Sequence, residues 1–217
     1  IQKLLVKVED DKPADVQVFA EHVSRSFNPI WRNANMKFLV EDGSNGVLDI
    51  YNEYLNLINS AKSEIVIANG YFIPDDAQAT AIRAAASRGV RVRILTNSID
   101  TNDYPQIARA GQLMYDKVLT GGNLPISLYE WGLPGGKGFA LYHAKWMCVD
   151  GENCIVGSFN FDPRSKSLNK ETVMSIQSSE VANELVSVFD ADTQPTTSTL
   201  ITADKAKSLQ NATDAKG

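Results

Sequence analysis

The sequence lacks the features that define several protein classes. Its 217 residues include only Cys148 and Cys154, too few for a disulfide framework and without zinc-ligand spacing. Because both stand in apolar runs, we expect them to be small, buried, apolar side chains. No apolar stretch approaches the ~20 residues of a membrane span, and no signal peptide is recognisable. No lysine–arginine run occurs, and 21 basic against 26 acidic residues give a net charge of −5. Since generic DNA binding rests on phosphate neutralisation, this balance disfavours a nucleic-acid partner.

What is present is typical of a globular protein, with 43% hydrophobic and 22% charged residues. The chain starts at Ile1 rather than methionine, so it is either processed or part of something longer. We expect three regions: an N-terminal connecting segment (1–45), a folded half-domain (46–190) and a polar C-terminal tail (191–217) that frays at its end. Within the flanking regions the pattern predicts short strands at 1–8 and 198–202 and a helix over 16–27.

Helical and extended patterns alternate through the central region. Apolar spacing predicts helices over 47–58, 74–88, 104–119 and 181–189, and strands over 63–68, 90–96, 126–130, 144–149, 153–156 and 172–176. The Asp150-Gly151 dipeptide predicts a hairpin turn between two of these strands. Such alternation indicates an α/β fold, with a mixed, largely parallel β-sheet flanked by helices on both faces.

Four polar residues stand at regular spacing around this hairpin. His143 and Lys145 are two residues apart, as are Ser158 and Asn160, so each pair faces one side of an extended strand. The hairpin should bring the two pairs together. Because none of the four is acidic, and because lysine supplies charge while serine and asparagine donate oriented hydrogen bonds, the pocket suits a phosphate. The alternative interpretation, a core histidine beside a surface lysine, leaves Ser158 and Asn160 unexplained.

This spacing resembles the HxK(x)4D(x)6GSxN motif (HKD motif) of the phospholipase D superfamily, and its positions are matched by His143, Lys145, Asp150, Gly157, Ser158 and Asn160. The resemblance implies a phospholipase D-like domain. It also implies that the histidine is nucleophile or general acid/base at a phosphodiester, that lysine and asparagine hold phosphate oxygens, and that no metal or other cofactor is needed. At the hairpin turn, Asp150 fits a structural role better than a catalytic one.

Further segments extend the resemblance over about residues 47–189, towards the bacterial cardiolipin synthase branch: YFIP (Tyr71–Pro74), RGVRVRILTNS (Arg88–Ser98), FDPR (Phe161–Arg164) and SLNKE (Ser167–Glu171). The resemblance implies that Glu171 orients a catalytic imidazole. It also places Tyr71 beside the substrate. Asn97, Ser98 and Asp103 either support the site or cap loops. Trp131, Phe139, Leu141 and Trp146 either form an apolar path for acyl chains or pack in the core or a dimer contact. The glycine-rich loop 132–138 is either a gate or a flexible connector.

The family's chemistry requires two motifs, and this chain has one. The only other histidine, His22, has no lysine two residues later and is expected to be ordinary. The chain is therefore either the C-terminal half of a two-motif enzyme, which we favour, or one copy of a homodimer.

The resemblance implies a phosphatidyltransferase acting on phospholipid through a phosphohistidine, with the other HKD half as partner, peripheral membrane contact and a bacterial membrane location. The alternative is a homodimeric single-motif phosphodiesterase or nuclease. A third possibility is a silent half that only docks its partner.

Overall fold

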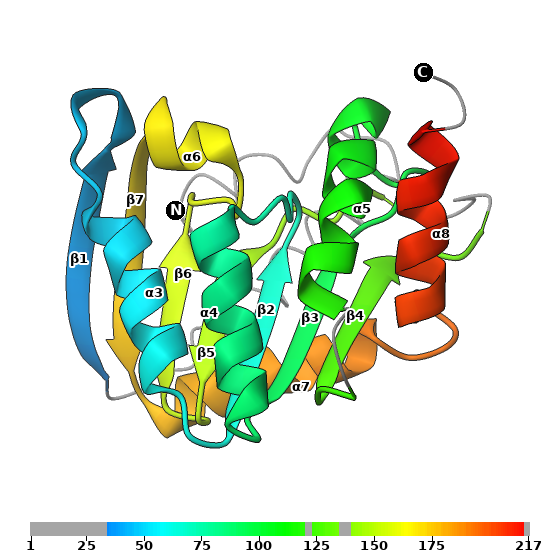
Figure 1. The fold of residues 1–217 in the computed structure, drawn as a ribbon. Helices are drawn as coiled ribbons and strands as arrows, with labels where there is room; N and C mark the ends of the chain where they lie inside the picture. The colour runs from blue at the N-terminus through cyan, green and yellow to red at the C-terminus, as the bar shows by residue number, and fades with distance from the viewer. Residues whose placement is uncertain (1–33, 120–122, 135–139, 215–217) are drawn as a thin grey trace, which may run out of the picture. The chain divides into compact units, whose positions relative to one another are not determined.

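Eight strands form one open sheet in the computed structural model of the chain, with helices on both faces (Figure 1). The structure describes residues 34–119, 123–134 and 140–214, and the compact unit that holds the sheet begins at Ala34. The elements in chain order are β1 (Asn35–Asp42), η2 (Gly43–Asn45), α3 (Asp49–Ser60), β2 (Glu64–Asn69), α4 (Asp76–Ser87), β3 (Arg91–Asn97), α5 (Pro105–Leu119), β4 (Ile126–Trp131), β5 (Lys145–Val149), β6 (Asn153–Gly157), α6 (Pro163–Ser167), β7 (Lys170–Gln177), α7 (Ser179–Asp192), β8 (Ser198–Ile201) and α8 (Ala203–Asp214).

The strands lie in the order β1-β7-β6-β5-β2-β3-β4-β8. Neighbours β2–β3 and β3–β4 are parallel and are connected through α4 and α5, as crossover units require. The other pairings are antiparallel. The predicted α/β class, mixed sheet and helices on both faces are thus confirmed. The parallel part is limited to three strands, because the HKD-like hairpin and β7 pair in antiparallel order.

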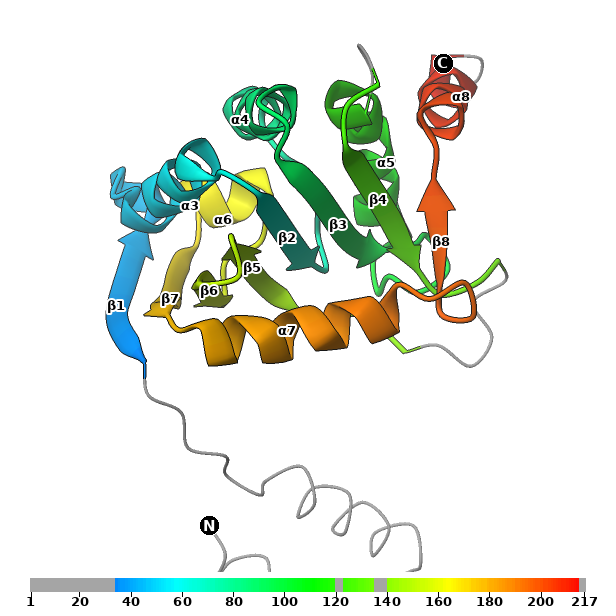
Figure 2. The ribbon, with the colours of Figure 1, turned by 90° about the horizontal axis from the view of Figure 1, so that it is seen from below.

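Helices cover the two faces of the sheet unequally. α3, α4, α5 and α8 lie on one face, and α7 runs across the other (Figure 2). The larger core lies under the first group and includes Tyr54, whose ring contacts those of Phe159 and Phe161 with centroids 5.2 Å and 5.1 Å away. A smaller core under α7 contains Trp146 and Phe189. Burial on both faces explains the continuous apolar runs of the central strands.

The folded unit extends beyond the region that we expected from 46 to 190. β1 pairs with β7, β8 pairs with β4, and α8 packs beside α5. The strand predicted at 198–202 is present as β8. The tail also contains a helix that we did not predict, α8, which buries Ala206 completely, while the last residues, 215–217, where we expect fraying, lie outside the described residues. The strand predicted at 1–8, the helix at 16–27, His22 and residues 135–139 of the glycine-rich loop lie outside the described residues.

The predicted hairpin joins β5 and β6. The turn occupies residues 150–152, between the paired Val149 and Asn153. Asp150 (φ 54°) and Gly151 (φ 66°) are both left-handed, and the Glu152 N–H donates to the Val149 carbonyl at 3.2 Å. This register sets Cys148 directly opposite Cys154, with Cα atoms 4.1 Å apart, and the two form a disulfide. Both are buried, as expected, but the interpretation as separate apolar side chains is wrong, because the turn fixes which residues face each other across the hairpin.

Candidate active site

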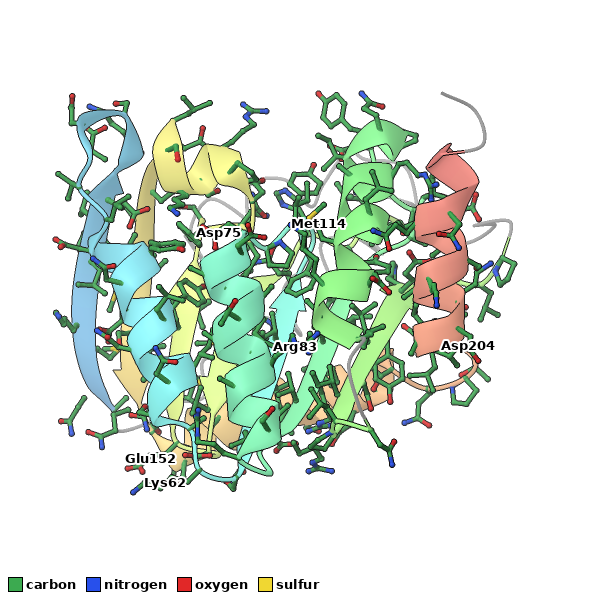
Figure 3. The ribbon with its side chains drawn as sticks, viewed as in Figure 1. Lys62, Asp75, Arg83, Met114, Glu152 and Asp204 are labelled. Atoms are coloured by element: carbon green, nitrogen blue, oxygen red, sulfur yellow. A yellow bond between two sulfur atoms is a disulfide. The ribbon has the colours of Figure 1, made fainter. Side chains whose placement is uncertain are left out.

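The polar residues of interest gather at one edge of the sheet, where β2 and β3 end and β5 begins. Asn69, the last residue of β2, is the register partner of Lys145, the first of β5. Asp75, which caps the start of α4, lies at this edge in Figure 3, whereas Lys62 and Glu152 lie at the opposite one. Carboxyl ends of parallel strands are where open α/β sheets bind ligands. The site therefore forms at the expected place.

Tyr71 connects the residues of the HxK pair. Its ring lies edge-on to the imidazole of His143, with centroids 6.2 Å apart, and the Lys145 ammonium is 5.9 Å from the ring centroid. The Tyr71 hydroxyl donates a 2.6 Å hydrogen bond to the Asp103 carboxylate. Burial, and then this carboxylate, raise the pKa of Tyr71 above its ordinary value. Tyr71 is thus held protonated between His143 and Lys145. Asp103 holds the Tyr71 hydroxyl, which agrees with the interpretation that Asp103 supports the site rather than caps a loop.

Asn97 fixes the backbone just before His143. Its Nδ2 donates to the carbonyls of Tyr142 (2.6 Å) and Gly70 (3.0 Å), and its Oδ1 accepts from the Tyr142 N–H (2.8 Å). A Cβ on Gly70 would lie 2.5 Å from the Tyr142 carbonyl oxygen, so only glycine permits this approach. Asn97 therefore supports the site. Ser98 instead contacts Thr101 within its own loop.

Asn160 and Tyr71 line a cavity of about 380 Å³. Its walls also include Tyr104, Asp162 and Arg164. Asn160 is 9% exposed, and its side-chain oxygen is buried without a hydrogen-bond partner among the described residues. The amide nitrogen of Asn160 donates to none of the described residues and is not among their buried unpaired atoms, so it can donate a hydrogen bond to a phosphate oxygen, whereas the amide oxygen can only accept from a donor.

Glu171 lies beneath the cavity in a dense set of hydrogen bonds. Ser165 Oγ donates to its Oε1 (2.8 Å), as does Asn169 Nδ2 (3.0 Å), and Ser158 Oγ donates to its Oε2. No hydrogen bond joins Glu171 to His143 in the residues the structure describes. The expected carboxylate–imidazole contact is therefore not formed here, and Glu171 instead orders the loop that carries Asn160, whose N–H donates to Ser165 Oγ.

Two buried polar groups lie behind Glu171. Glu41 on β1 is paired directly with Glu171 on the neighbouring strand β7, and it is 0% exposed. One oxygen of Glu41 accepts from the Tyr51 N–H (2.8 Å), but the other is buried without a partner, as is the hydroxyl of Tyr54. Burial raises the pKa of Glu41, and the nearby charge of Glu171 adds to this. Glu41 is thus biased towards its neutral form.

Lys145 is the cation of the site. Burial lowers its pKa below the ordinary lysine value, and the charges of Glu171, Asp162 and Asp103 oppose this effect. The only hydrogen bond that its ammonium makes to the described residues is to the His143 carbonyl, at 3.3 Å. An ammonium so weakly engaged and partly dehydrated binds an anion strongly, because little hydration is lost on binding.

The structure does not bring every predicted site residue to this edge. Asp150 accepts from the backbone N–H groups of residues 62, 63 and 64 and from the Ser63 hydroxyl, at 2.8–3.2 Å, at the far edge. These contacts lower its pKa against the effect of burial. Gly157 is needed for packing, since a Cβ would lie 2.2 Å from the Thr172 carbonyl oxygen. The Ser158 hydroxyl is engaged by Glu171 and by the Thr172 N–H.

The aromatic residues near the motif divide between core and surface. Trp146 is 6% exposed and packs under α7 against Phe189. Trp131 stacks on Tyr142, with ring centroids 5.4 Å apart. Leu141 is 36% exposed, and Phe139 lies outside the described residues. The core interpretation thus holds for Trp146. Across the described ranges, no cluster of three or more histidine, cysteine, aspartate or glutamate side chains is arranged to hold a metal.

Sequence reasoning missed several supporting residues. Asn69 donates to the Phe159 carbonyl (3.2 Å) and accepts from the Phe161 N–H (3.3 Å), which ties β2 to the loop after β6. Ser165 and Asn169 hold Glu171. Asn169 lies within a segment quoted for the resemblance, so its signal was available, whereas Ser165 lies between two such segments. Nothing in the local pattern singles out Asn69, whose contacts span about 90 residues.

Comparison with known proteins agrees with this geometry. The fold is that of phospholipase D-like proteins. NucT from Helicobacter pylori superposes with a TM-score of 0.56 at 22% identity, covering 73% of this chain and 95% of that one. Phosphatidylserine synthase from Haemophilus influenzae Rd KW20 superposes with a TM-score of 0.62 at 12% identity, covering 94% and 52%.

Sequence comparison narrows the class. Residues 54–193 match the family model described as "Cardiolipin synthase, PLD-like domain", and the chain belongs to that family. It is 34% identical over 161 residues to a cardiolipin synthase of Clostridium perfringens (strain SM101 / Type A), covering 74% of this chain and 31% of that protein. It is 33% identical over 138 residues to cardiolipin synthase C of Escherichia coli (strain K12), covering 58% and 29%. The chain thus spans about a third of the length of these relatives.

Proposed function

We propose that this chain supplies one of two HKD halves of a phosphatidyltransferase that resembles cardiolipin synthases. The observation that carries the proposal is the grouping of His143, Lys145 and Asn160 around Tyr71 at one edge of the sheet. It supplies a nucleophile or acid, a cation and an unpaired amide, the groups that a phosphodiester needs. Membership in the cardiolipin synthase, PLD-like domain family supports a phospholipid as the substrate.

The reaction proceeds in two displacements at phosphorus. One histidine of the pair attacks the phosphodiester, so a P–N bond forms as the P–O bond to the headgroup breaks, and the second histidine gives its proton to the leaving alkoxide. That second histidine then takes the proton of an acceptor hydroxyl, whose oxygen attacks phosphorus and releases the first histidine. Lys145 and Asn160 stabilise the phosphate oxygens in both steps. Water in place of the acceptor gives hydrolysis.

The second histidine comes from outside this chain's single motif. The relatives are more than twice as long as this chain, since the matched part covers only 31% and 29% of them, and this supports a second half in the same polypeptide. The likeness in fold to NucT, which this chain covers to 95%, keeps a homodimer as the second candidate. The mass in solution, measured by light scattering after size exclusion, separates them: a dimer of the 23.8 kDa chain supports the homodimer, and a monomer supports the longer enzyme.

Activity tests the proposal with a matched pair of histidine variants. Phosphatidyl transfer from labelled phosphatidylglycerol vesicles is measured in the complete gene product that contains these residues, beside cleavage of single-stranded DNA. We expect His143→Ala to abolish transfer and His22→Ala, at the chain's only other histidine, to retain it. Full activity of His143→Ala would refute the assignment. Cleavage of DNA without lipid transfer would establish the nuclease alternative.

A further inference from the structure

A second cavity, larger than the one beside His143, lies between α5 and α8 over the end of β4. Its volume is about 570 Å³, within the range of small-molecule sites. The two helices that form its walls run side by side in Figures 1 and 2. Glu130, Thr199 and Ile201 line it from β4 and β8. None of the residues of the HKD motif lines this cavity.

A buried carboxyl group provides the polar end of this cavity. Glu130 is 9% exposed. Its Oε1 accepts from Gln112 Nε2 (2.9 Å) and from the Tyr115 hydroxyl (3.0 Å). Its Oε2 accepts no hydrogen bond from the described residues. It is also not one of the polar side-chain atoms that are buried without a hydrogen-bond partner. Glu130 thus has one oxygen fixed by the protein and one available to a ligand in the cavity.

A cation lies within reach of the same ligand. Lys205, in the first turn of α8, lines the cavity, and its ammonium makes no ion pair or hydrogen bond with the described residues. Its charge acts on Glu130, where it opposes the rise in pKa that burial causes. Arg109 is fixed by Gln112 Oε1 (3.1 Å) and the Leu209 carbonyl (2.7 Å), so it shapes the wall.

The remaining walls are apolar and partly open to solvent. Ile99 is 41% and Leu133 37% exposed, and Pro134 and Leu209 complete this side. Aliphatic side chains around a mouth favour a ligand with an aliphatic part. The lining holds two acidic side chains, Glu130 and Asp100, and two basic ones, Lys205 and Arg109. This balance of charge suits a neutral hydroxyl group, because a hydroxyl both donates and accepts.

We propose that this cavity binds a neutral amphiphile with a hydroxylic head and a short aliphatic chain, of the monoacylglycerol type. A hydroxyl of the head donates to Glu130 Oε2 and accepts from the Lys205 ammonium, while the chain packs between Ile99, Leu133 and Leu209. This inference goes beyond the proposed function and does not rest on it, since binding requires neither His143 nor a second HKD half.

Calorimetric titration of the full chain with 1-octanoylglycerol below its micelle concentration tests the site. We expect saturable binding that Glu130→Gln weakens about tenfold and Lys205→Met about fivefold, since each loses one polar contact to a charged group. Lys207→Met removes the same charge on the same helix away from the cavity and should bind as the parent does. His143→Ala should also bind unchanged, which separates this proposal from the proposed function.

Three results would overturn the proposal. One is no binding of 1-octanoylglycerol. Another is binding that Lys205→Met and Lys207→Met weaken equally; this comparison suffices even where Glu130→Gln fails to fold. The third is tighter binding of octanoate or octylamine than of 1-octanoylglycerol, which would assign a charged ligand class to the cavity.

Discussion

The two edges of the sheet use polar groups in opposite ways. At the edge with the hairpin turn, the Asp150 carboxylate is saturated by backbone and hydroxyl donors. At the other edge, Asn160 holds an unpaired buried oxygen and the Lys145 ammonium contacts only a carbonyl. Satisfied polar groups stabilise a fold, and unsatisfied ones are available to a ligand. The difference assigns stability to one edge and chemistry to the other.

A single motif supplies both edges. β5 separates Lys145 from Asp150, and five residues at about 3.3 Å each place them roughly 17 Å apart. The residues that look like one constellation in the sequence therefore have separable roles. Variants at the two ends should divide cleanly between loss of activity and loss of stability.

The largest expected effect is at the edge that holds Lys145 and Asn160, here called the active edge. Lys145→Met removes the cation that faces the phosphate, and we expect phosphatidyl transfer to fall about 10²- to 10³-fold. The unfolding midpoint in urea should not fall, because a partly buried charge is removed along with its dehydration cost.

Lys166 provides the control at the same edge. Its ammonium is paired with the Asp75 carboxylate at 2.6 Å, whereas the Lys145 ammonium has no carboxylate partner among the described residues. Lys166→Met should lower stability modestly and leave the transfer rate of the folded protein unchanged. Equal loss of rate in both variants would mean that general charge, rather than the placed ammonium, drives the reaction.

The next effect is at the opposite edge. Asp150→Ala leaves the N–H groups of residues 62–64 without their acceptor and puts a Cβ-bearing residue without local hydrogen bonding at φ 54°. We expect the free energy of unfolding in urea to fall by about 2 kcal/mol. Asp150→Asn, which tolerates this conformation and keeps one acceptor, should lose about half as much. A normal midpoint with lost transfer activity would contradict the structural role of Asp150.

Elements of the fold that follow from local sequence patterns could be predicted, and elements that depend on distant contacts could not. Regular apolar spacing predicts the helices and strands between residues 47 and 189, except α6, because their burial repeats with the period of the element. α6 has only five residues, too few to show a period. β1 escapes this reasoning, since Met36, Phe38 and Val40 are more than half exposed while the polar Glu41 is fully buried. α8 escapes it because only Ala206 is fully buried, in a helix that is otherwise polar.

The sequence predicts the members of the candidate site but not the contacts that they make. Motif spacing indicates His143, Lys145 and Asn160, since strand geometry turns spacing into direction. It does not indicate that Glu171 binds Ser158, Ser165 and Asn169, because these contacts depend on how the loop after β6 folds back. The disulfide is similar, since only the hairpin register pairs its cysteines.

The smallest expected effect is a pH-dependent change in stability at Glu41, behind the active edge. Burial and the charge of Glu171 raise the pKa of Glu41, so the neutral form is favoured when folded. The stability that this contributes is fully present below the ordinary glutamate pKa and is lost as pH rises through the raised value. Glu41→Gln, which stays neutral and still accepts from the Tyr51 N–H, should therefore match the parent at pH 4 and exceed it by about 1 kcal/mol or less at pH 8.

Thermal or urea unfolding across this pH range measures the difference. Glu152→Gln makes the same exchange at an exposed position of the opposite edge and should leave the pH dependence as it is. A Glu41→Gln protein that is less stable than the parent at pH 8 would show that Glu41 is charged when folded. The picture of a neutral Glu41 carboxyl behind Glu171 would then have to be abandoned.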